Sequence, residues 1–370
     1  MPANDEERAR DLRLMQECLD LAKQAQGRTA PNPLVGSIVL DADGQVVGKG
    51  FHPRAGQKHA EIFALQEAGQ RACGGSLYVT LEPCSHYGRT PPCLKAVLNS
   101  GVARVIIGTE DPNPQVAGTS IRALSAAGIE VSVGLLAEEC LWLNRGFFKR
   151  MRQGLPWITL KLAVTLDGKI ADRTGSSRWI SGEPARRYVH SLRNVYDCLL
   201  VGIGTALKDD PELTVREIEN ANTPARAVYD PDLRLSPNSR LCSPRQGGEP
   251  TAGTLILCSK EMALARSSEF AAHVQLLGFN ATARTEGEQP LTLSMQALAD
   301  AGLNTVLCEG GGKFAASLIE QRLIDEVHWI IAPKLLVDGA GVLGLCGSAA
   351  VNLADCVELA NPAVSTLGSD

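Results

Sequence analysis

One histidine and two cysteines have types and spacing suited to binding a metal. His59 stands at the expected start of a helix, Cys84 follows an expected strand, and Cys93 comes nine positions later. One imidazole and two thiolates can hold zinc at three positions, which leaves the fourth position of a tetrahedral site open for water. The sequence therefore predicts a catalytic zinc bound by His59, Cys84 and Cys93.

Glu61 has a different expected role, because it lies beside the ligands without being needed as one. Such a carboxylate can take a proton from the zinc-activated water and deliver it to a ring nitrogen of the substrate. The pattern H-x-E followed by P-C-x-x-C is typical of zinc-dependent nucleobase deaminases. This sequence has the same order but separates the cysteines by nine positions instead of three. We therefore predict hydrolytic deamination with Glu61 as general acid and base.

Alternating helices and strands are expected to position this cluster. Apolar periodicity predicts helices over 12–25, 59–71, 93–98 and 121–127, and strands over 34–40, 45–51, 76–81, 104–107 and 130–133. This rhythm is typical of an α/β domain. The metal ligands fall at helix starts and strand ends, where side chains from different elements can meet.

Four segments extend the motif well beyond the ligands. They are PNPLVGSIVL (31–40), GKGFHPRAG (48–56), HAE (59–61) and VTLEPCSHYGRTPPC (79–93). Through them the chain resembles the bifunctional deaminase and reductase family of riboflavin biosynthesis. The resemblance implies an N-terminal domain with a cytidine-deaminase-like fold. It also implies a diaminopyrimidinone substrate that carries a phosphoribosylamino group, with Asn32 hydrogen-bonded to the ring.

The second half of the chain contains other chemically informative segments. KLAVTLDGKIA (161–171) leads into a polar loop, VGIGTALKDDPELTVR spans 201–216, and TVLCEGGGKF (305–314) carries three glycines before an expected helix. Glycines at such a turn let backbone N–H groups approach a phosphate. A plain strand-to-helix turn would explain them equally well. No G-x-G-x-x-G follows the first strand of this half, so an ordinary Rossmann dinucleotide site is not supported.

Periodicity again predicts an α/β series in this half. Strands are expected over 157–164, 197–201, 305–308 and 326–331, and helices over 184–195 and 314–321. The segments resemble the reductase domain of the same family, which is similar to dihydrofolate reductase in fold and uses NADPH. The resemblance implies hydride transfer from the nicotinamide to the first carbon of the sugar, which opens the ribose into a ribityl chain.

The same resemblance implies the reductase site residues. It places the cofactor at Ala163, Trp179, Thr205, Asp209, Gly311, Gly312 and Lys313. It places the substrate at Ser177, Arg193, Leu213, Arg216 and Glu309. Asp209 is the candidate for proton handling near the hydride. Arg193 and Arg216 suit the 5′-phosphate, because a guanidinium forks onto paired oxygens, although either could be an ordinary surface ion-pair partner.

The pattern breaks between the two series, at 138–156. Basic residues there surround Gly146 and Gly154, which suits either a solvated linker or a basic rim near an anionic ligand. We therefore predict a zinc-dependent pyrimidine deaminase domain over 1–150 and an NADPH-dependent reductase domain over 151–370. Because each half has its own α/β series, a fragment ending near Ala137 is expected to deaminate alone, and one starting near Arg152 to reduce alone.

Length, charge and cysteine usage bound the remaining possibilities. A chain of 370 residues favours two cores over one, and a net charge of -5 argues against broad nucleic-acid binding. The start MPANDEERARDLRL has no signal-like apolar run, and no stretch is long enough to cross a bilayer. A reduced, cytoplasmic enzyme of a small pyrimidine nucleotide is expected. The sequence leaves open whether the chain forms a homo-oligomer.

Two other functions are compatible with the zinc motif taken alone. A nucleic-acid-editing deaminase would share the zinc ligands and Glu61, but it would need a basic channel, which an acidic chain does not suggest. A zinc-stabilised nucleotide sensor would share the ligands, but it would have no need of Glu61. Both are less consistent with the sequence than a bifunctional enzyme.

Overall fold

The computed structural model describes residues 5–87, 91–114, 116–177, 179–244, 253–282, 289–337, 340–341 and 359–370. The chain divides into two compact units, Met1–Gly154 and Leu155–Asp370. This division lies four residues after the boundary expected at 150, because a helix continues through that position. Within the part of the chain that is described, no helix has both the length and the apolar character needed to span a membrane.

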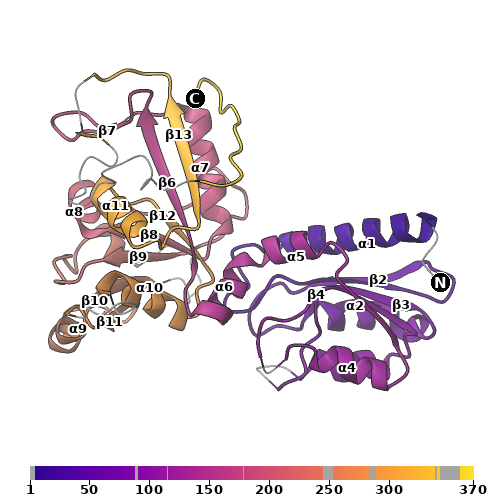
Figure 1. The fold of residues 1–370 in the computed structure, drawn as a ribbon. Coiled ribbons are helices and arrows are strands. Elements are labelled where there is room, and N and C mark those ends of the chain that lie inside the picture. The colour runs from indigo at the N-terminus through magenta and orange to yellow at the C-terminus, as the bar shows by residue number, and fades with distance from the viewer. Residues whose placement is uncertain are drawn as a thin grey trace. The chain divides into compact units, whose positions relative to one another are not determined.

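Unit 1 is built on one five-stranded sheet with the strand order β2-β1-β3-β4-β5 (Figure 1). β1 pairs antiparallel with β2 and β3, whereas β3, β4 and β5 are parallel. Its elements are α1 (Asp5–Lys23), β1 (Gly36–Leu40), β2 (Val46–Phe51), α2 (Ala60–Ala68), β3 (Ser76–Leu81), α3 (Cys93–Asn99), β4 (Arg104–Thr109), α4 (Thr119–Ala126), β5 (Glu130–Val133), α5 (Ala137–Leu143) and α6 (Arg145–Gln153). The nine elements predicted for this half are all present.

Successive residues of a strand point to opposite faces of the sheet. Both faces of this sheet carry apolar side chains. Ile38 and Tyr78 pack with residues of α1, whereas Val39 and Val79 pack with residues of α2. Figure 1 shows α1 and α5 over one face and α2 and α4 over the other. Burial on both faces explains why β1 and β3 are nearly continuous apolar runs.

The prediction of a solvated linker in this segment is wrong, because the segment folds as α5 and α6. Phe147 and Phe148 are only 8% and 5% exposed and belong to the apolar core of unit 1. The basic residues that suggested a linker lie on the other positions of α6, so that the helix is amphipathic. A chain that stops near Ala137 therefore lacks part of the core of unit 1.

Unit 2 has a seven-stranded sheet with the order β11-β10-β9-β8-β12-β6-β13, and all its neighbouring strands are parallel. β7 and β14 form a separate antiparallel pair. The elements are β6 (Trp157–Thr165), β7 (Lys169–Ala171), α7 (Glu183–Val195), β8 (Cys198–Gly202), α8 (Ile203–Asp209), β9 (Ala225–Tyr229), β10 (Thr254–Ser259), α9 (Lys260–Arg266), β11 (Val274–Phe279), α10 (Pro290–Asp300), β12 (Thr305–Cys308), α11 (Gly312–Glu320), β13 (Glu326–Ala332) and β14 (Ala340–Gly341).

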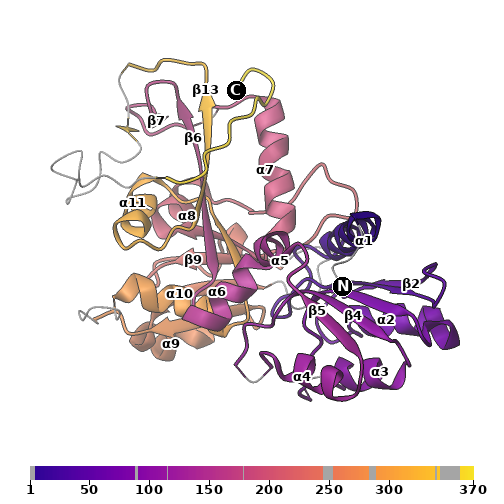
Figure 2. The same cartoon turned by 45° about the vertical axis from the view of Figure 1, so that its right-hand side comes forward.

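Helices cover both faces of this second sheet (Figure 2). Leu199 and Val201 of β8 pack with residues of α7 and α8, whereas Cys198 and Leu200 pack with residues of α10 and α11. The predicted elements of this half are present, and the additional ones are β7, α8, β9, β10, α9, β11, α10 and β14. Parallel strands covered on both faces place their carboxyl ends at one edge, where a ligand site is expected.

Candidate functional site

The predicted metal ligands converge in unit 1 from three different elements. His59 precedes α2, Cys84 follows β3, and Cys93 begins α3. The Nδ1 atom of His59 lies 3.5 Å from Sγ of Cys84 and 3.2 Å from Sγ of Cys93. A tetrahedral zinc, with distances of ~2.3 Å to sulfur and ~2.0 Å to nitrogen, holds such atoms roughly 3.5 Å apart. The three ligand atoms all lie within 4.8 Å of one another, close enough to share one zinc ion.

Glu61 lies on the first turn of α2, close to this cluster. Its side chain is buried, and its Oε2 atom has no hydrogen-bond partner among the described residues. A buried carboxylate oxygen of this kind indicates that a partner such as water or substrate completes the site. Burial, with the nearby charge of Cys84 adding to it, raises the pKa of Glu61 to about 7. A carboxyl group with such a pKa can both accept and donate protons near neutral pH.

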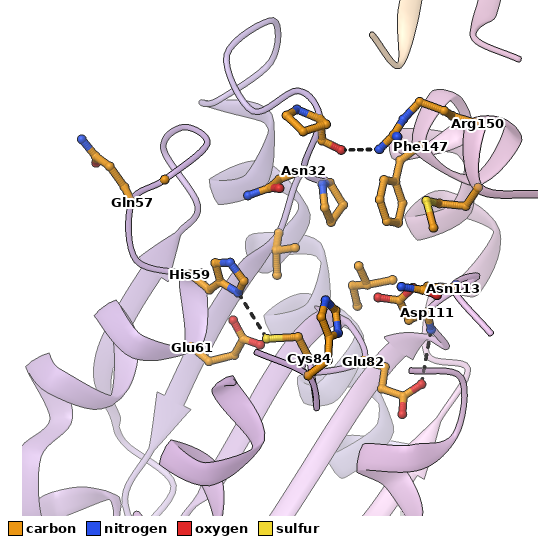
Figure 3. A pocket seen from close by; sticks show the side chains of 17 residues that line it. Asn32, Gln57, His59, Glu61, Glu82, Cys84, Asp111, Asn113, Phe147 and Arg150 are labelled. Carbon is orange, nitrogen blue, oxygen red and sulfur yellow. Dashed lines mark hydrogen bonds between the residues drawn. The ribbon is translucent and has the colours of Figure 1, made fainter. Parts of the chain in front are cut away.

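A pocket of about 360 Å³ opens beside the cluster, which is a usual size for a small-molecule site. His59, Glu61 and Cys84 lie on one side of it, and Phe147 and Arg150 come from α6 on another (Figure 3). Asp111 and Asn113, which follow β4, also line it. Burial raises the pKa of Asp111 to about 6. The sequence patterns did not single out Asp111 or Asn113.

Asn32, the predicted ring-binding residue, also lines this pocket and is bonded to His52. The Nδ2 atom of Asn32 lies 3.0 Å from Nε2 of His52, and Nδ1 of His52 lies 3.0 Å from the carbonyl oxygen of Lys58. Burial lowers the pKa of His52, which favours the neutral ring. His52 stands within the GKGFHPRAG segment, so its place just before the zinc motif was the available signal.

The end of unit 1 holds the chain segment that carries Asn32. The side-chain amide of Asn144 accepts from the backbone N–H of Leu34 at 2.7 Å and donates to the carbonyl of Leu34 at 2.8 Å. The guanidinium of Arg150 donates to the carbonyl of Pro31 at 2.7 Å (Figure 3). The region predicted to be either linker or basic rim is therefore a wall of the pocket.

Glu82 stabilises the chain segment that carries the predicted ligand Cys84. Its buried carboxylate points away from the pocket in Figure 3. Its two oxygens accept four backbone N–H groups at 2.9 to 3.4 Å, from Asp111, Gly118, Ser120 and Ile121. The hydroxyl of Ser120 also donates to the carbonyl of Pro83 at 2.6 Å. These bonds fix the backbone immediately before Cys84 and tie it to the loop that follows β4.

In unit 2, the predicted cofactor residues Thr205 and Gly311 meet. The backbone N–H of Gly311 donates to the hydroxyl of Thr205 at 3.0 Å. Thr205 lies on α8 after β8, Gly311 precedes α11 after β12, and these two strands are neighbours. A Cβ atom at Gly310 would lie 2.7 Å from Cδ1 of Phe314, so a larger residue there would have to displace the Phe314 ring. The turn leaves backbone room beside a helix start, which fits a cofactor phosphate.

Arg193 and Glu309, both predicted substrate residues, form a bidentate ion pair. Nε and Nη2 of Arg193 lie 2.6 and 2.9 Å from the two carboxylate oxygens of Glu309, and Nη1 donates to the carbonyl of Thr214 at 2.9 Å. The guanidinium is thus an ion-pair partner, although a largely buried one instead of the surface partner considered above. Arg216 is 62% exposed, and its Nη1 atom lies 3.9 Å from Oε2 of Glu212, which is the surface ion pair considered above. Its exposure makes it the more accessible of the two arginines for a phosphate.

Lys161 on β6 is a neighbour of this pair that the sequence patterns missed. Burial lowers the pKa of Lys161, and the positive charge of Arg193 adds to this effect, whereas Glu309 opposes it. A lysine inside an otherwise apolar buried strand was the available signal. Two cations therefore surround the carboxylate of Glu309, which lowers its own pKa despite burial.

The remaining predicted residues of unit 2 lie on the following elements. Ala163 is on β6 opposite Ile330, Asp209 ends α8, and Gly312 and Lys313 begin α11. Leu213 is buried with a positive φ of 47°, Ser177 is exposed, and Trp179 is 65% exposed with the guanidinium of Arg186 4.7 Å above its ring. The structure thus joins Thr205 with Gly311 and Arg193 with Glu309, and it places the others on β6, on helices and on loops.

Comparison with known families covers both units. Residues 8–109 match the cytidine and deoxycytidylate deaminase zinc-binding region, and residues 156–364 match the RibD C-terminal domain. The riboflavin biosynthesis protein RibD of Escherichia coli (strain K12) is 42% identical over 344 residues, which cover 90% of this chain and 89% of that protein. The chain belongs to the RibD family. RibD of Aquifex aeolicus is similarly related, with 40% identity over 90% of this chain and 89% of its own.

Solved RibD structures share the fold. Acinetobacter baumannii RibD superimposes with a TM-score of 0.85 at 34% identity, over 98% of this chain and 97% of that one. A Thermotoga maritima protein described as a diaminohydroxyphosphoribosylaminopyrimidine deaminase/5-amino-6-(5-phosphoribosylamino)uracil reductase gives 0.80 at 34% identity, over 94% and 93%. The predicted RibD resemblance and fold class are confirmed. The chain is a bifunctional enzyme of riboflavin biosynthesis, with a cytidine-deaminase-like domain and a RibD reductase domain.

Proposed function

We propose that unit 1 hydrolytically deaminates 2,5-diamino-6-(5-phosphoribosylamino)pyrimidin-4(3H)-one and that unit 2 reduces the ribosyl chain of the product with NADPH. The observation that carries the first half is that His59, Cys84 and Cys93 meet beside Glu61, whose Oε2 atom has no hydrogen-bond partner within the described part of the chain. The description of the Thermotoga maritima relative, which names both reactions, supports the choice of substrates.

Glu61 is the group that moves protons in the proposed deamination. A zinc ion held by the three ligands would lower the pKa of a water molecule. Hydroxide would then be available near neutral pH to attack the amine-bearing carbon. Oε2 of Glu61 takes the proton released by this water and passes it to the adjacent ring nitrogen. Glu61 then takes the second proton, from the hydroxyl group now on the carbon, and donates it to the amine as the C–N bond breaks. Ammonia leaves, and a ring carbonyl replaces the amine.

Asn32 holds the ring in this proposal. It lies on the pocket wall and is fixed by His52, while Asn144 and Arg150 fix the backbone on either side of it. Orientation of this kind brings the reacting carbon to the attacking water. A pocket of about 360 Å³ suits a small molecule such as a pyrimidine nucleotide.

The reductase proposal depends on the turn between β12 and α11. Thr205, Gly311, Gly312 and Lys313 would hold the phosphates of NADPH, which supplies the hydride when bound. Ala163 and Trp179 would complete the cofactor site. Asp209 would handle the proton that accompanies hydride transfer. We place the substrate at Ser177, Leu213, Arg216 and Glu309, with Arg193 positioning the carboxylate of Glu309.

The deciding experiment supplies the purified protein with the diaminopyrimidinone nucleotide and measures two signals separately. Ammonia release without NADPH reports deamination, and NADPH oxidation after deamination reports reduction. Zinc-dependent ammonia release followed by stoichiometric NADPH oxidation is expected. A protein with bound zinc that releases no ammonia from this nucleotide would refute the substrate assignment. We also propose that the enzyme acts in the cytoplasm, which is consistent with the free cysteines of the described residues.

A further inference from the structure

His52 connects the predicted ring-binding residue to the backbone next to a metal ligand. It follows β2 and is 2% exposed, and its backbone N–H donates to the carbonyl of Val35 at 3.0 Å. Its ring stands 5.1 Å from that of His59 in an edge-to-face arrangement. One ring nitrogen faces Lys58, which precedes His59, and the other faces Asn32. In the proposed mechanism His52 only contacts Asn32, and its effect on the orientation of the Asn32 amide has consequences for substrate recognition.

The two contacts of His52 fix which nitrogen carries the proton. A backbone carbonyl can only accept a hydrogen bond, so Nδ1, 3.0 Å from the carbonyl oxygen of Lys58, must donate. In the neutral ring Nε2 is then an acceptor. The group that lies 3.0 Å from Nε2 is the side-chain amide of Asn32, and only its Nδ2 end can donate. The opposite orientation of the amide would set two acceptors against each other.

We propose that His52 is a positioning residue for the deamination, which locks the side-chain amide of Asn32 with its nitrogen toward His52 and so presents its carbonyl oxygen as the acceptor for an N–H group of the pyrimidine. This inference rests on the proposed deaminase function. An aminopyrimidine ring offers N–H donors from its exocyclic amines and its ring nitrogens. A flipped amide would offer a donor in place of that acceptor and would select a different ring edge.

The hydrogen bond to the carbonyl oxygen of Lys58 restricts the orientation of the His52 ring. His52 and His59 bracket a short loop, and the carbonyl of Lys58 anchors the imidazole from within it. The backbone of Asn32 is fixed as well, because its N–H donates to the carbonyl of Thr29 at 2.8 Å. Both partners of the Asn32–His52 bond therefore have little freedom to rotate. Orientation achieved before binding lowers the cost of ordering the site when substrate enters.

The test compares His52→Phe with the wild-type full-length chain, using ammonia release from the diaminopyrimidinone nucleotide. Phenylalanine keeps the ring shape but removes both hydrogen bonds. We expect KM to rise about tenfold, the effect of losing one oriented hydrogen bond, while kcat changes less than about threefold. Zinc content and NADPH-dependent reduction by the same chain should stay at wild-type level. His273→Phe is the matched control, because it removes a histidine bond to a carbonyl, that of Cys242 in unit 2.

A double-mutant cycle shows whether His52 acts through Asn32. In an Asn32→Ala background, the additional change His52→Phe should leave KM unaltered. Effects that multiply would overturn the proposal, as would an unchanged KM in the single variant. If His52→Phe does not retain zinc, the cycle is repeated with His52→Gln; loss of zinc in both variants would also overturn it, because His52 would then serve His59. Failure of the wild-type protein to release ammonia would instead refute the proposed function.

Discussion

The side-chain amide of Asn144 forms two hydrogen bonds to the backbone of Leu34, one as acceptor and one as donor. An amide placed in this way substitutes for a neighbouring strand residue and fixes the segment that contains Asn32. Asn144 lies between α5 and α6, 110 residues after Leu34. The deaminase pocket is therefore complete only when the chain extends through α6.

This relationship predicts where the deaminase unit can be cut. A fragment of residues 1–154 should bind zinc and deaminate, whereas residues 1–137 should not, because the shorter fragment lacks Asn144 and the buried side chains of Phe147 and Phe148. Ammonia release per zinc-loaded molecule is the measurement, with folding checked by circular dichroism. Wild-type activity in a folded 1–137 fragment would show that α5 and α6 are dispensable.

Glu61→Gln should abolish deamination while zinc stays bound. The amide keeps the shape of the side chain but cannot exchange protons, and loss of a general acid and base costs roughly 100- to 10,000-fold in rate. Reduction of the already deaminated substrate by the same protein is the internal control and should be unchanged. Wild-type ammonia release by correctly folded Glu61→Gln protein would exclude this role.

Cys84→Ser and Cys93→Ser should each lose zinc and deamination together. A hydroxyl is a much poorer zinc ligand than a thiolate, and we expect about one zinc per wild-type chain and far less in either variant. Cys73→Ser is the control, since Cys73 is exposed and outside the cluster. Metal analysis of the purified proteins gives the answer. Zinc at the wild-type level in both ligand variants would mean that the metal binds elsewhere.

Much of this site could be predicted because its chemistry lies in short segments. His59 and Glu61 share one helix start, Cys84 follows a strand, and a nearly continuous apolar run identifies that strand. Local spacing and strand periodicity carry this information directly. The elements β9, β10 and β11 went unpredicted in unit 2, because apolar runs of five or six residues without alternation are hard to distinguish from buried helix.

The pairings that complete both sites are distant in sequence and could not be predicted from local patterns. Arg193 and Glu309 are 116 residues apart, and their ion pair changes the expected role of the arginine. In α6, basic residues lie on both sides of two adjacent phenylalanines, and the charges suggested a linker before the structure showed which face is buried. Only the tertiary fold decides which of several plausible partners a charged side chain meets.

Glu82→Gln should destabilise unit 1. Each carboxylate oxygen accepts two backbone N–H groups, and an amide would turn its NH2 group toward two of these donors. Leaving buried donors unsatisfied costs about 1–3 kcal/mol, more where a charged acceptor is removed. Chemical denaturation of the full chain should show a loss of this size in the deaminase transition. Glu130→Gln, at a side chain that is 72% exposed, should change stability by less than about 0.5 kcal/mol. Equal stability of the two variants would contradict the role of Glu82.

Thr205→Val should weaken NADPH binding without affecting deamination. Valine has nearly the same shape as threonine but cannot accept the hydrogen bond from the backbone N–H of Gly311, which fixes the turn before α11. We expect the KM for NADPH to rise about tenfold in Thr205→Val, the effect of about one hydrogen bond, and Thr205→Ser to restore most of the loss because its hydroxyl is retained. Steady-state NADPH oxidation with the deaminated substrate measures both variants, and ammonia release from the same preparations verifies that unit 1 is intact. The bond between Thr205 and Gly311 stabilises one conformation of a glycine-rich turn, so its loss should act mainly on cofactor binding. A folded Thr205→Val protein with a wild-type KM for NADPH would show that this turn is not the cofactor site.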